Sequence, residues 1–305
     1  MALPGILLRW SIDPSIVLGI LLAIALYWRG TARSLRVVGP TSRQSRVPQA
    51  LAFAAGLIVV ILALESPIDY LSASLFSFHM IQHLLLIMVA APLLLLGDPG
   101  VTIMRGIPLE VRRGVLRAGS RRRWVRRFAR GASKAGSPRG AFIIFAADLY
   151  LWHWSKLFNL TLQNGAVHVT EHLCFLLTAV LWWSQVIDQR AMHARLSYAH
   201  RAVFTVFTAG VTNILALFFV FAPQPLYSAY AGLSSRPYGM TVLGDQQIAG
   251  AIMWVPVLFV FGGAFAVCLY KALAEDERES ATNPIGGMPY STVFSNTDTG
   301  TIRHR

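Results

Sequence analysis

The chain has 305 residues, of which 55% are hydrophobic and only 13% are charged, and its formal net charge is +13. Soluble domains usually carry about 25% charged residues, so the composition argues against a soluble protein. Long apolar runs separated by arginine-rich patches are typical of a polytopic membrane protein. Because the basic residues are confined to the patches between these runs, we expect contact with membrane lipid and no nucleic-acid partner.

The apolar runs predict seven transmembrane helices, given about 20 residues per crossing. They lie at about 15–29, 49–66, 75–97, 140–158, 166–187, 201–222 and 246–271. The first run is short, but it lacks a clear small-residue cleavage site, so we expect it to be retained as a span. Asp148 interrupts the fourth run. We therefore predict an all-α, polytopic membrane domain over residues 1–272.

The basic residues predict how these spans are oriented. The connections after spans 1, 3 and 5 are rich in Arg, above all residues 105–139 with RRRWVRRFAR at 121–130, whereas the alternate connections carry almost none. Positively charged loops stay in the cytoplasm, so we predict the N-terminus outside and the C-terminus in the cytoplasm. Segment 105–139 either lies on anionic lipid as an amphipathic helix or is a topology signal alone. The polar tail 273–305 is predicted to be disordered.

Five of the eight histidines fall at the predicted outer ends of spans. Span 3 opens with SFHMIQHLLL, which carries His79 and His83; His153 ends span 4, and His168 and His172 open span 5. Each i, i+4 pair places two imidazoles on one helix face, and such a pair can offer two nitrogens to one metal ion. A lone histidine at a helix end commonly just bonds to a neighbour. Five at one membrane face predict a metal site, which we expect in a shallow aqueous funnel.

The choice of metal depends on the ligand types. Imidazole alone suits copper or zinc, a thioether favours Cu(I), and a carboxylate favours zinc or Cu(II). Asp245, Met253 and Glu171 are candidates for additional metal ligands or for residues that contact the ligand side chains without binding the metal. Met80 and Cys174 are interpreted as packing residues, because neither shares a helix face with the histidine near it in sequence. We predict copper, with zinc or haem as alternatives.

Three other functions fit parts of this pattern. HVTEH at 168–172 matches the H-x-x-E-H zinc-hydrolase pattern, with Glu171 as general base, although an acid near a helix N-terminus is also favoured by the helix dipole. Two histidines on different spans can ligate haem, but a haem protein moving electrons across the membrane would carry histidines at both faces. A copper transporter would need ligands toward the inner face, where the sequence offers little beyond Asp148, Asn213 and Cys268.

Three stretches resemble the seven-span CtaG family of bacterial cytochrome c oxidase assembly factors. They are FSFHMIQHLLLIMVAAPLLLLGDP, LWHWSKLFNLTLQNGAVHVTEHLCFLLTAVLWW, and PLYSAY followed by DQQIAGAIMWVP, and the resemblance covers roughly residues 60–270. The family's characteristic residues are all present, namely His79, His83, His153, His168, His172 and Asp245. The chain departs from the family at AAP (90–92) and HWSK (153–156), where relatives carry a further proline.

This resemblance implies a protein of the bacterial plasma membrane that helps a haem-copper oxidase subunit to acquire its metal centre through copper supply. We expect a copper-binding assembly factor with no catalytic residues rather than an enzyme. Delivery of a metal does not require catalysis, and the sequence shows no nucleophile–base pair beside the histidines.

Overall fold

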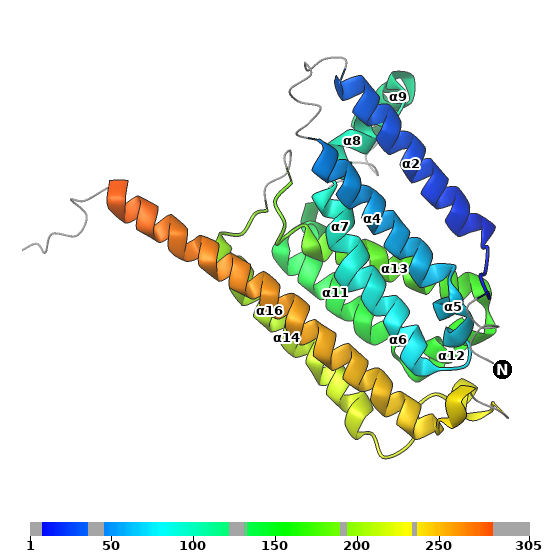
Figure 1. Cartoon of the computed structure of the whole chain (residues 1–305). Coiled ribbons are helices and arrows are strands. Elements are labelled where there is room, and N and C mark those ends of the chain that lie inside the picture. Colours follow the sequence, from blue (N-terminus) through cyan, green and yellow to red (C-terminus); the bar gives the residue numbers. More distant parts are fainter. Residues whose placement is uncertain are drawn as a thin grey trace, which may run out of the picture.

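The computed structural model describes residues 8–35, 46–121, 131, 133–189, 194–233 and 237–282, and all its regular elements are helical (Figure 1). The α-helices are α2 (Pro14–Leu35), α4 (Val47–Leu64), α5 (Pro67–Ser72), α6 (Phe76–Leu84), α7 (Ala91–Leu96), α8 (Pro99–Gly106), α9 (Leu109–Arg121), α11 (Pro138–Trp152), α12 (Ser155–Gln163), α13 (Gly165–Trp183), α14 (Tyr198–Phe221), α15 (Ser228–Ala231) and α16 (Val242–Thr282). A π-helical segment, η1 (Leu85–Ala90), and a 3₁₀ turn, η2 (Pro237–Gly239), complete the set. The all-α prediction is confirmed for these residues.

Six helical stretches of the described chain are long and apolar enough to cross a membrane. They are Pro14–Leu35, Val47–Ser72, Phe76–Leu96, Gly165–Trp183, Tyr198–Phe221 and Val242–Glu279. These correspond to the predicted spans 1, 2, 3, 5, 6 and 7. The chain therefore fits a multi-pass membrane protein.

The fourth predicted span, 140–158, is not one continuous helix. α11 has 15 residues, the backbone is extended at Trp154, and α12 begins directly after it. Side chains bind to carbonyls at this break. The Leu149 carbonyl accepts a hydrogen bond from His153 Nδ1 at 2.7 Å, and the His153 carbonyl accepts one from the Tyr227 hydroxyl at 2.9 Å. At 1.5 Å per residue, α11 is only about 22 Å long, shorter than a typical hydrocarbon core of ~30 Å.

The last helix passes the predicted end of the membrane domain at residue 272. α16 has 41 residues and continues to Thr282, so residues 273–282 are helical and the prediction of a disordered tail is wrong for them. The reason is local composition, because KALAEDERESA consists mainly of strong helix formers and contains neither glycine nor proline. The rest of the predicted tail, 283–305, lies outside the described residues.

Span 3 is interrupted by the π-helical segment η1, which begins two residues after His83. One carbonyl of this segment, that of Ile87, accepts a hydrogen bond from Trp183 Nε1 at 2.8 Å. Trp183 is the last residue of α13. Single π-turns inside α-helices occur frequently at functional sites, and this one lies immediately below the pair of histidines on α6.

The helices pack as a bundle around span 3, whose segments contact α4, α13 and α16, while α14 and α16 pack along each other (Figure 1). α2 packs on α8, and glycine permits this approach. A Cβ on Gly30 would collide with the Thr102 carbonyl, and one on Gly106 with the Leu26 carbonyl. Two glycines facing backbone in this way let the helices touch.

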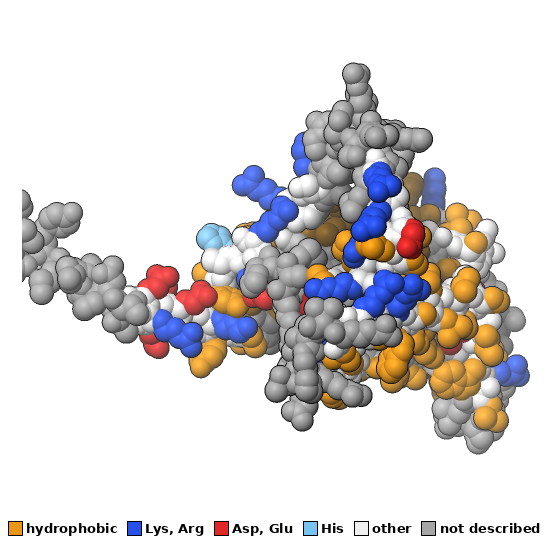
Figure 2. All heavy atoms as spheres, turned by 90° about the horizontal axis from the view of Figure 1, so that it is seen from above, with side chains coloured by type: hydrophobic (Ala, Val, Ile, Leu, Met, Phe, Trp, Pro, Cys, Tyr) orange, Lys and Arg blue, Asp and Glu red, His pale blue; other side chains and the backbone are white. Residues whose placement is uncertain are grey.

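The two ends of the bundle differ in chemistry. α5, α12 and the first turns of α6 and α16 lie at one end, and α8 and α9 lie at the other (Figure 1). Figure 2 shows this second end, where Lys and Arg side chains gather. α9 forms a 13-residue helix within the predicted basic segment. Residues 122–130 of that segment, with His193 and His304, lie outside the described residues.

An ion pair holds the connection between α13 and α14. Arg201 Nη1 and Nη2 donate to the two carboxylate oxygens of Asp188 at 2.7 and 2.9 Å, and the Tyr198 hydroxyl donates at 3.0 Å. Partial burial alone would raise the pKa of Asp188, but the Arg201 donors and the other hydrogen bonds outweigh it and lower this pKa to about 2.

Acid is therefore expected to remove a stabilising contribution of Asp188. The contribution is complete above the ordinary carboxyl pKa of 3.8 and is lost as the pH falls through the folded-state pKa of about 2. Thermal unfolding of the detergent-solubilised protein and of Asp188→Asn should differ clearly at about pH 5 and converge near about pH 2. A difference that stays constant across this range would contradict the assignment.

Candidate metal centre

α6 carries His79 and His83 into the centre of the bundle. Its first turn is held by Asp245 of α16, whose carboxylate accepts hydrogen bonds from the Phe76 amide at 2.7 Å and the Ser77 amide at 3.1 Å. Amides at a helix start have no partner within the helix, so this distant carboxylate acts as their cap. Asp245 thus positions the helix that carries His79, and its oxygens bind backbone amides.

α13 supplies the opposite wall of the site. Its start is fixed by Asn164, whose side chain accepts hydrogen bonds from two amides of the first turn at 3.0 and 3.3 Å. His168, Glu171 and His172 follow within the first two turns. The i, i+3 and i+4 spacing places these three side chains on one face, which is directed at α6.

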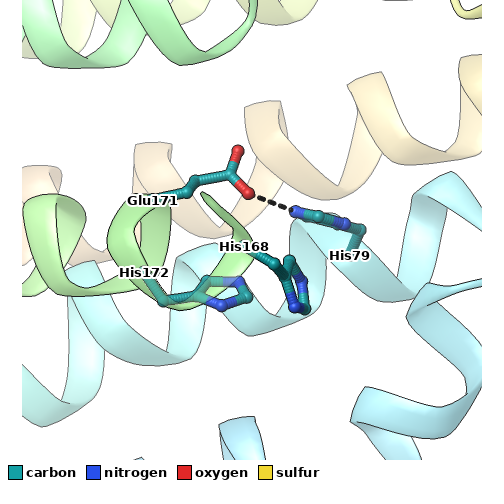
Figure 3. A group of neighbouring side chains, drawn as sticks. All are labelled: His79, His168, Glu171 and His172. Carbon is teal, nitrogen blue, oxygen red and sulfur yellow. Dashed lines mark hydrogen bonds and ion pairs between the residues drawn. The ribbon is translucent and has the colours of Figure 1, made fainter. Parts of the chain in front are cut away.

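Four of these side chains form a compact group, which we call the quartet. Ligand atoms of His79, His168, Glu171 and His172 lie within 4.8 Å of one another (Figure 3). Glu171 Oε2 lies 3.2 Å from His79 Nε2, and the rings of His168 and His172 have centroids 4.3 Å apart. Three imidazoles and one carboxylate are a donor set that suits zinc or copper.

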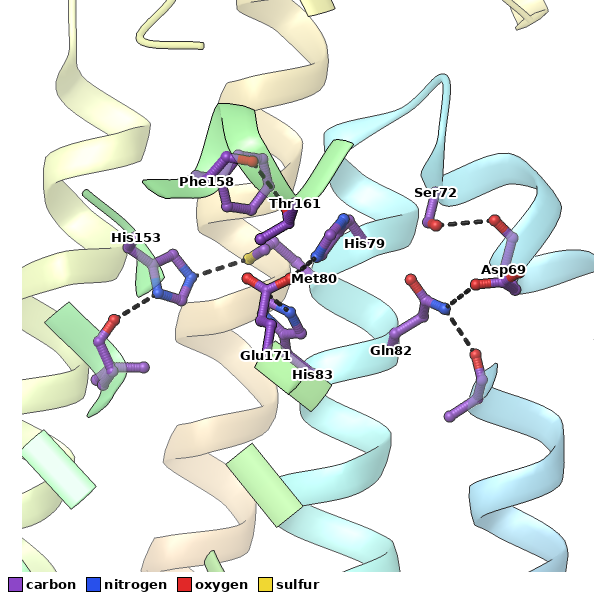
Figure 4. A network of polar contacts seen from close by, with 12 residues as sticks. Asp69, Ser72, His79, Met80, Gln82, His83, His153, Phe158, Thr161 and Glu171 are labelled. Atoms are coloured by element: carbon purple, nitrogen blue, oxygen red, sulfur yellow. Dashed lines mark hydrogen bonds and ion pairs between the residues drawn. The ribbon is translucent and has the colours of Figure 1, made fainter. Parts of the chain in front are cut away.

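The other two predicted histidines lie directly beside the quartet. The ring centroid of His83 is 4.6 Å from that of His79, 5.2 Å from that of His172 and 5.6 Å from that of His153. His153, at the end of α11, has its Nε2 3.4 Å from the Sδ of Met80 (Figure 4). The structure therefore brings the five histidines singled out from the sequence into one contiguous group.

Many polar atoms of this group lack a partner in the protein. Among the described residues, no hydrogen-bond partner is present for six buried atoms: His79 Nδ1, both ring nitrogens of His83, His168 Nε2, His172 Nε2 and Glu171 Oε1. Leaving one such atom unpaired costs about 1–3 kcal/mol. A single cation could bind several of them at once, so the residues present fit a metal ion.

The site is enclosed, so the predicted shallow funnel is wrong. The side chains of His79, His83 and Glu171 are at most 4% exposed. They are covered by α12, whose Phe158 is 0% exposed and packs on His79 with ring centroids 4.8 Å apart. The connection between α11 and α13 contains the amphipathic helix α12, whose buried face, with Phe158 and Thr161, packs over the site. His168 is only partly buried, so the site lies nearest to solvent on the side of His168.

Two residues that lie next to the histidine cluster were not expected there from the sequence. Met80 was assigned to packing because it points about 100° away from His79, yet its i, i+3 spacing to His83 places it on the face that meets α11. Gln82 donates to a backbone carbonyl of α4 at 2.8 Å and to Asp69 Oδ1 at 2.9 Å, which ties α6 in place behind the histidines. The spacing was the available signal for Met80. Nothing in the sequence marks Gln82.

Comparisons with known proteins agree with this arrangement. The model of a family described as cytochrome c oxidase caa3 assembly factor matches residues 25–275, which confirms the resemblance indicated by the motifs. Uncharacterized proteins of Mycobacterium bovis and Mycobacterium tuberculosis are each 24% identical over 284 residues, covering 91% of this chain and 41% of theirs. One from Mycobacterium leprae is 26% identical over 253 residues, covering 77% and 37%. The chain thus spans about two fifths of the length of these relatives. No solved structure matches it.

Proposed function

Because this chain belongs to the cytochrome c oxidase caa3 assembly factor family, we propose that it binds copper at the histidine cluster and helps a haem-copper oxidase subunit to acquire its metal centre. The family role implies contact with the oxidase during assembly. The quartet of His79, His168, Glu171 and His172, with His83 beside it, would hold the ion. The protein acts as a metal-binding assembly factor rather than as an enzyme.

One observation carries this proposal. Six buried polar atoms within a single cluster have no hydrogen-bond partner among the described residues, and four of the side chains converge within 4.8 Å. A buried cluster that served packing alone would be more stable with apolar side chains. The cost of keeping imidazoles and a carboxylate there is offset when a cation binds them.

Copper is favoured over haem by the available space. The histidine rings pack against one another with centroids 4.3–5.6 Å apart, and the cavity beside them has a volume of about 20 Å³. A porphyrin needs a slot between its axial ligands, whereas a single ion fits between ring nitrogens. The donor set also suits zinc, and copper is preferred because the family serves a copper-containing oxidase.

The membrane arrangement proposed for this function is that of a bacterial plasma-membrane protein with seven crossings. α11 would supply the short fourth crossing, the N-terminus would lie outside, and the end that carries α8 and α9 would face the cytoplasm and its anionic lipid. α2 begins at the histidine-bearing end of the bundle and α16 ends at the other (Figure 1), as an odd number of crossings requires. The metal would then be held near the outer surface.

Metal analysis with a double substitution tests the proposal. Full-length protein purified in detergent should carry copper, and His79→Ala with His172→Ala should carry clearly less, because two of the four converging ligands are removed. Cells carrying this variant should assemble oxidase that lacks its copper signals. His200→Ala is the control, since His200 is exposed and bonds only to Ser197 among the contacts described. Full copper content together with a normal oxidase would overturn the proposal, and oxidase loss with unchanged copper would replace it with a scaffolding role.

A further inference from the structure

A second set of potential ligands lines a small cavity next to the quartet. Three methionines from different parts of the bundle meet there, Met80 of α6, Met88 of η1 and Met253 of α16, and none is more than 5% exposed. The side chains of His83 and His153 also line this cavity. The cavity has a volume of about 20 Å³, which is enough to hold one water molecule or one metal ion.

The proton on His153 can be assigned from its hydrogen bond. Its Nδ1 lies 2.7 Å from the Leu149 carbonyl oxygen, which can only accept, so Nδ1 carries the proton. A neutral ring then has a lone pair on Nε2, and a charged ring buried at 7% exposure without an anion would be costly. That lone pair points at Met80 Sδ, 3.4 Å away, and a thioether has no hydrogen to donate. Two electron-pair donors therefore face each other with no proton between them.

This spacing is that of two ligands on one metal ion. With metal–nitrogen and metal–sulfur bonds of about 2.0 and 2.3 Å, a separation of 3.4 Å between nitrogen and sulfur corresponds to an angle of about 100° at the metal. Such an angle is close to the tetrahedral value. Thioether sulfur is a soft donor that selects Cu(I) over zinc.

We propose that Met80 Sδ and His153 Nε2, with Met253 and His83 in the cavity wall, form a Cu(I) subsite beside the quartet. His83 links the two, because its ring lies 5.6 Å from that of His153 and 5.2 Å from that of His172. The proposal rests on the proposed copper-binding function and adds to it a site that prefers the reduced ion. No redox step is part of this proposal: an ion that passed between the two sites as Cu(I) would exchange imidazole and carboxylate ligands for imidazole and thioether ligands.

Cu(I) binding to sulfur is the property to measure. Full-length protein in detergent is loaded anaerobically with Cu(I) in competition with a chromophoric Cu(I) chelator, and X-ray absorption at the copper edge reports sulfur ligands at ~2.3 Å. Zn(II) binding is measured separately. Met80→Leu with Met253→Leu is the test variant, because this swap conserves volume and is tolerated in cores. Met104→Leu is the matched control, since Met104 is 54% exposed on α8.

The Met80→Leu/Met253→Leu protein should lose the sulfur signal and at least about tenfold in Cu(I) affinity, while Zn(II) binding stays as in the unmodified protein and shows that the fold is intact. The His79→Ala/His172→Ala protein should lose Zn(II) and keep sulfur-bound Cu(I). Copper bound without sulfur, or a sulfur signal unchanged in the methionine variant, would overturn this inference and leave the proposed function standing. Failure of the unmodified protein to bind any copper would overturn both.

Discussion

Replacing Asp245 by alanine is expected to lower the free energy of unfolding by about 3–6 kcal/mol, because hydrogen bonds to a charged acceptor contribute about 1.5–3 kcal/mol each. The carboxylate is 0% exposed and accepts from the amides of Phe76 and Ser77, on a helix distant in sequence. Its removal leaves both amides buried without that acceptor. Since His79 follows in the next turn of α6, the same change is expected to weaken metal binding.

Equilibrium unfolding in detergent would measure this effect. Asp245→Asn keeps one acceptor oxygen in place and should cost about half as much. Asp276→Ala is the matched control, because Asp276 lies exposed on the same helix and its replacement should stay within about 0.5 kcal/mol of zero. Equal stability of Asp245→Ala and Asp276→Ala would mean that the start of α6 does not depend on this cap.

Replacing Glu171 by glutamine is expected to stabilise the metal-free protein and to weaken its metal binding. The carboxylate is 0% exposed and has two histidine nitrogens near it, His79 Nε2 at 3.2 Å and His83 Nε2 at 3.6 Å. Burying a charge without a full partner costs several kcal/mol, which a neutral amide avoids. The same charge attracts a cation, so we expect at least about a tenfold loss of Zn(II) or copper affinity, or about 1.4 kcal/mol.

Thermal unfolding with and without added metal separates the two effects. Glu171→Gln should melt at a higher temperature than the unmodified protein without metal, and its metal-induced rise should be smaller. Glu65→Gln is the control: Glu65 is also buried, at 5% exposure, but its side chain accepts from the Asp13 amide away from the cluster. A metal-induced rise that is the same in Glu171→Gln as in the unmodified protein would show that the carboxylate is not a ligand.

The sequence predicted the long elements well, because hydropathy depends only on local composition. Six of its spans correspond to helical stretches of the structure, and the i, i+4 pairs do face each other across α6 and α13. The sequence-based prediction failed where contacts between residues distant in sequence, rather than local composition, determine the structure. The helix of the fourth apolar run stops at Trp152, and the Tyr227 hydroxyl that binds the His153 carbonyl at this break is distant in sequence.

The same limit explains what was missed at the site. From the sequence, Glu171 could be explained equally by a helix dipole and by a metal, and its approach to His79 Nε2 was not predicted. Asp245 was a candidate ligand by composition, but its oxygens are bound to the start of another helix. The funnel was an inference from topology. Its closure by Phe158 on α12 depends on how a connection folds back, which periodicity does not reveal.

The π-helical segment η1 has a consequence for how this site tolerates change. Each residue added to or removed from a helix turns everything beyond it by about 100°, so η1 sets the angular phase between the histidine-bearing half of span 3 and the half held by Trp183 through Ile87. Deleting one residue from Leu85–Ala90 would leave the hydrophobicity of the span almost unchanged. It would also swing His79 and His83 more than a quarter turn away from α13. The geometry of the histidine cluster therefore depends on the number of residues in an apolar segment that itself carries none of the histidines.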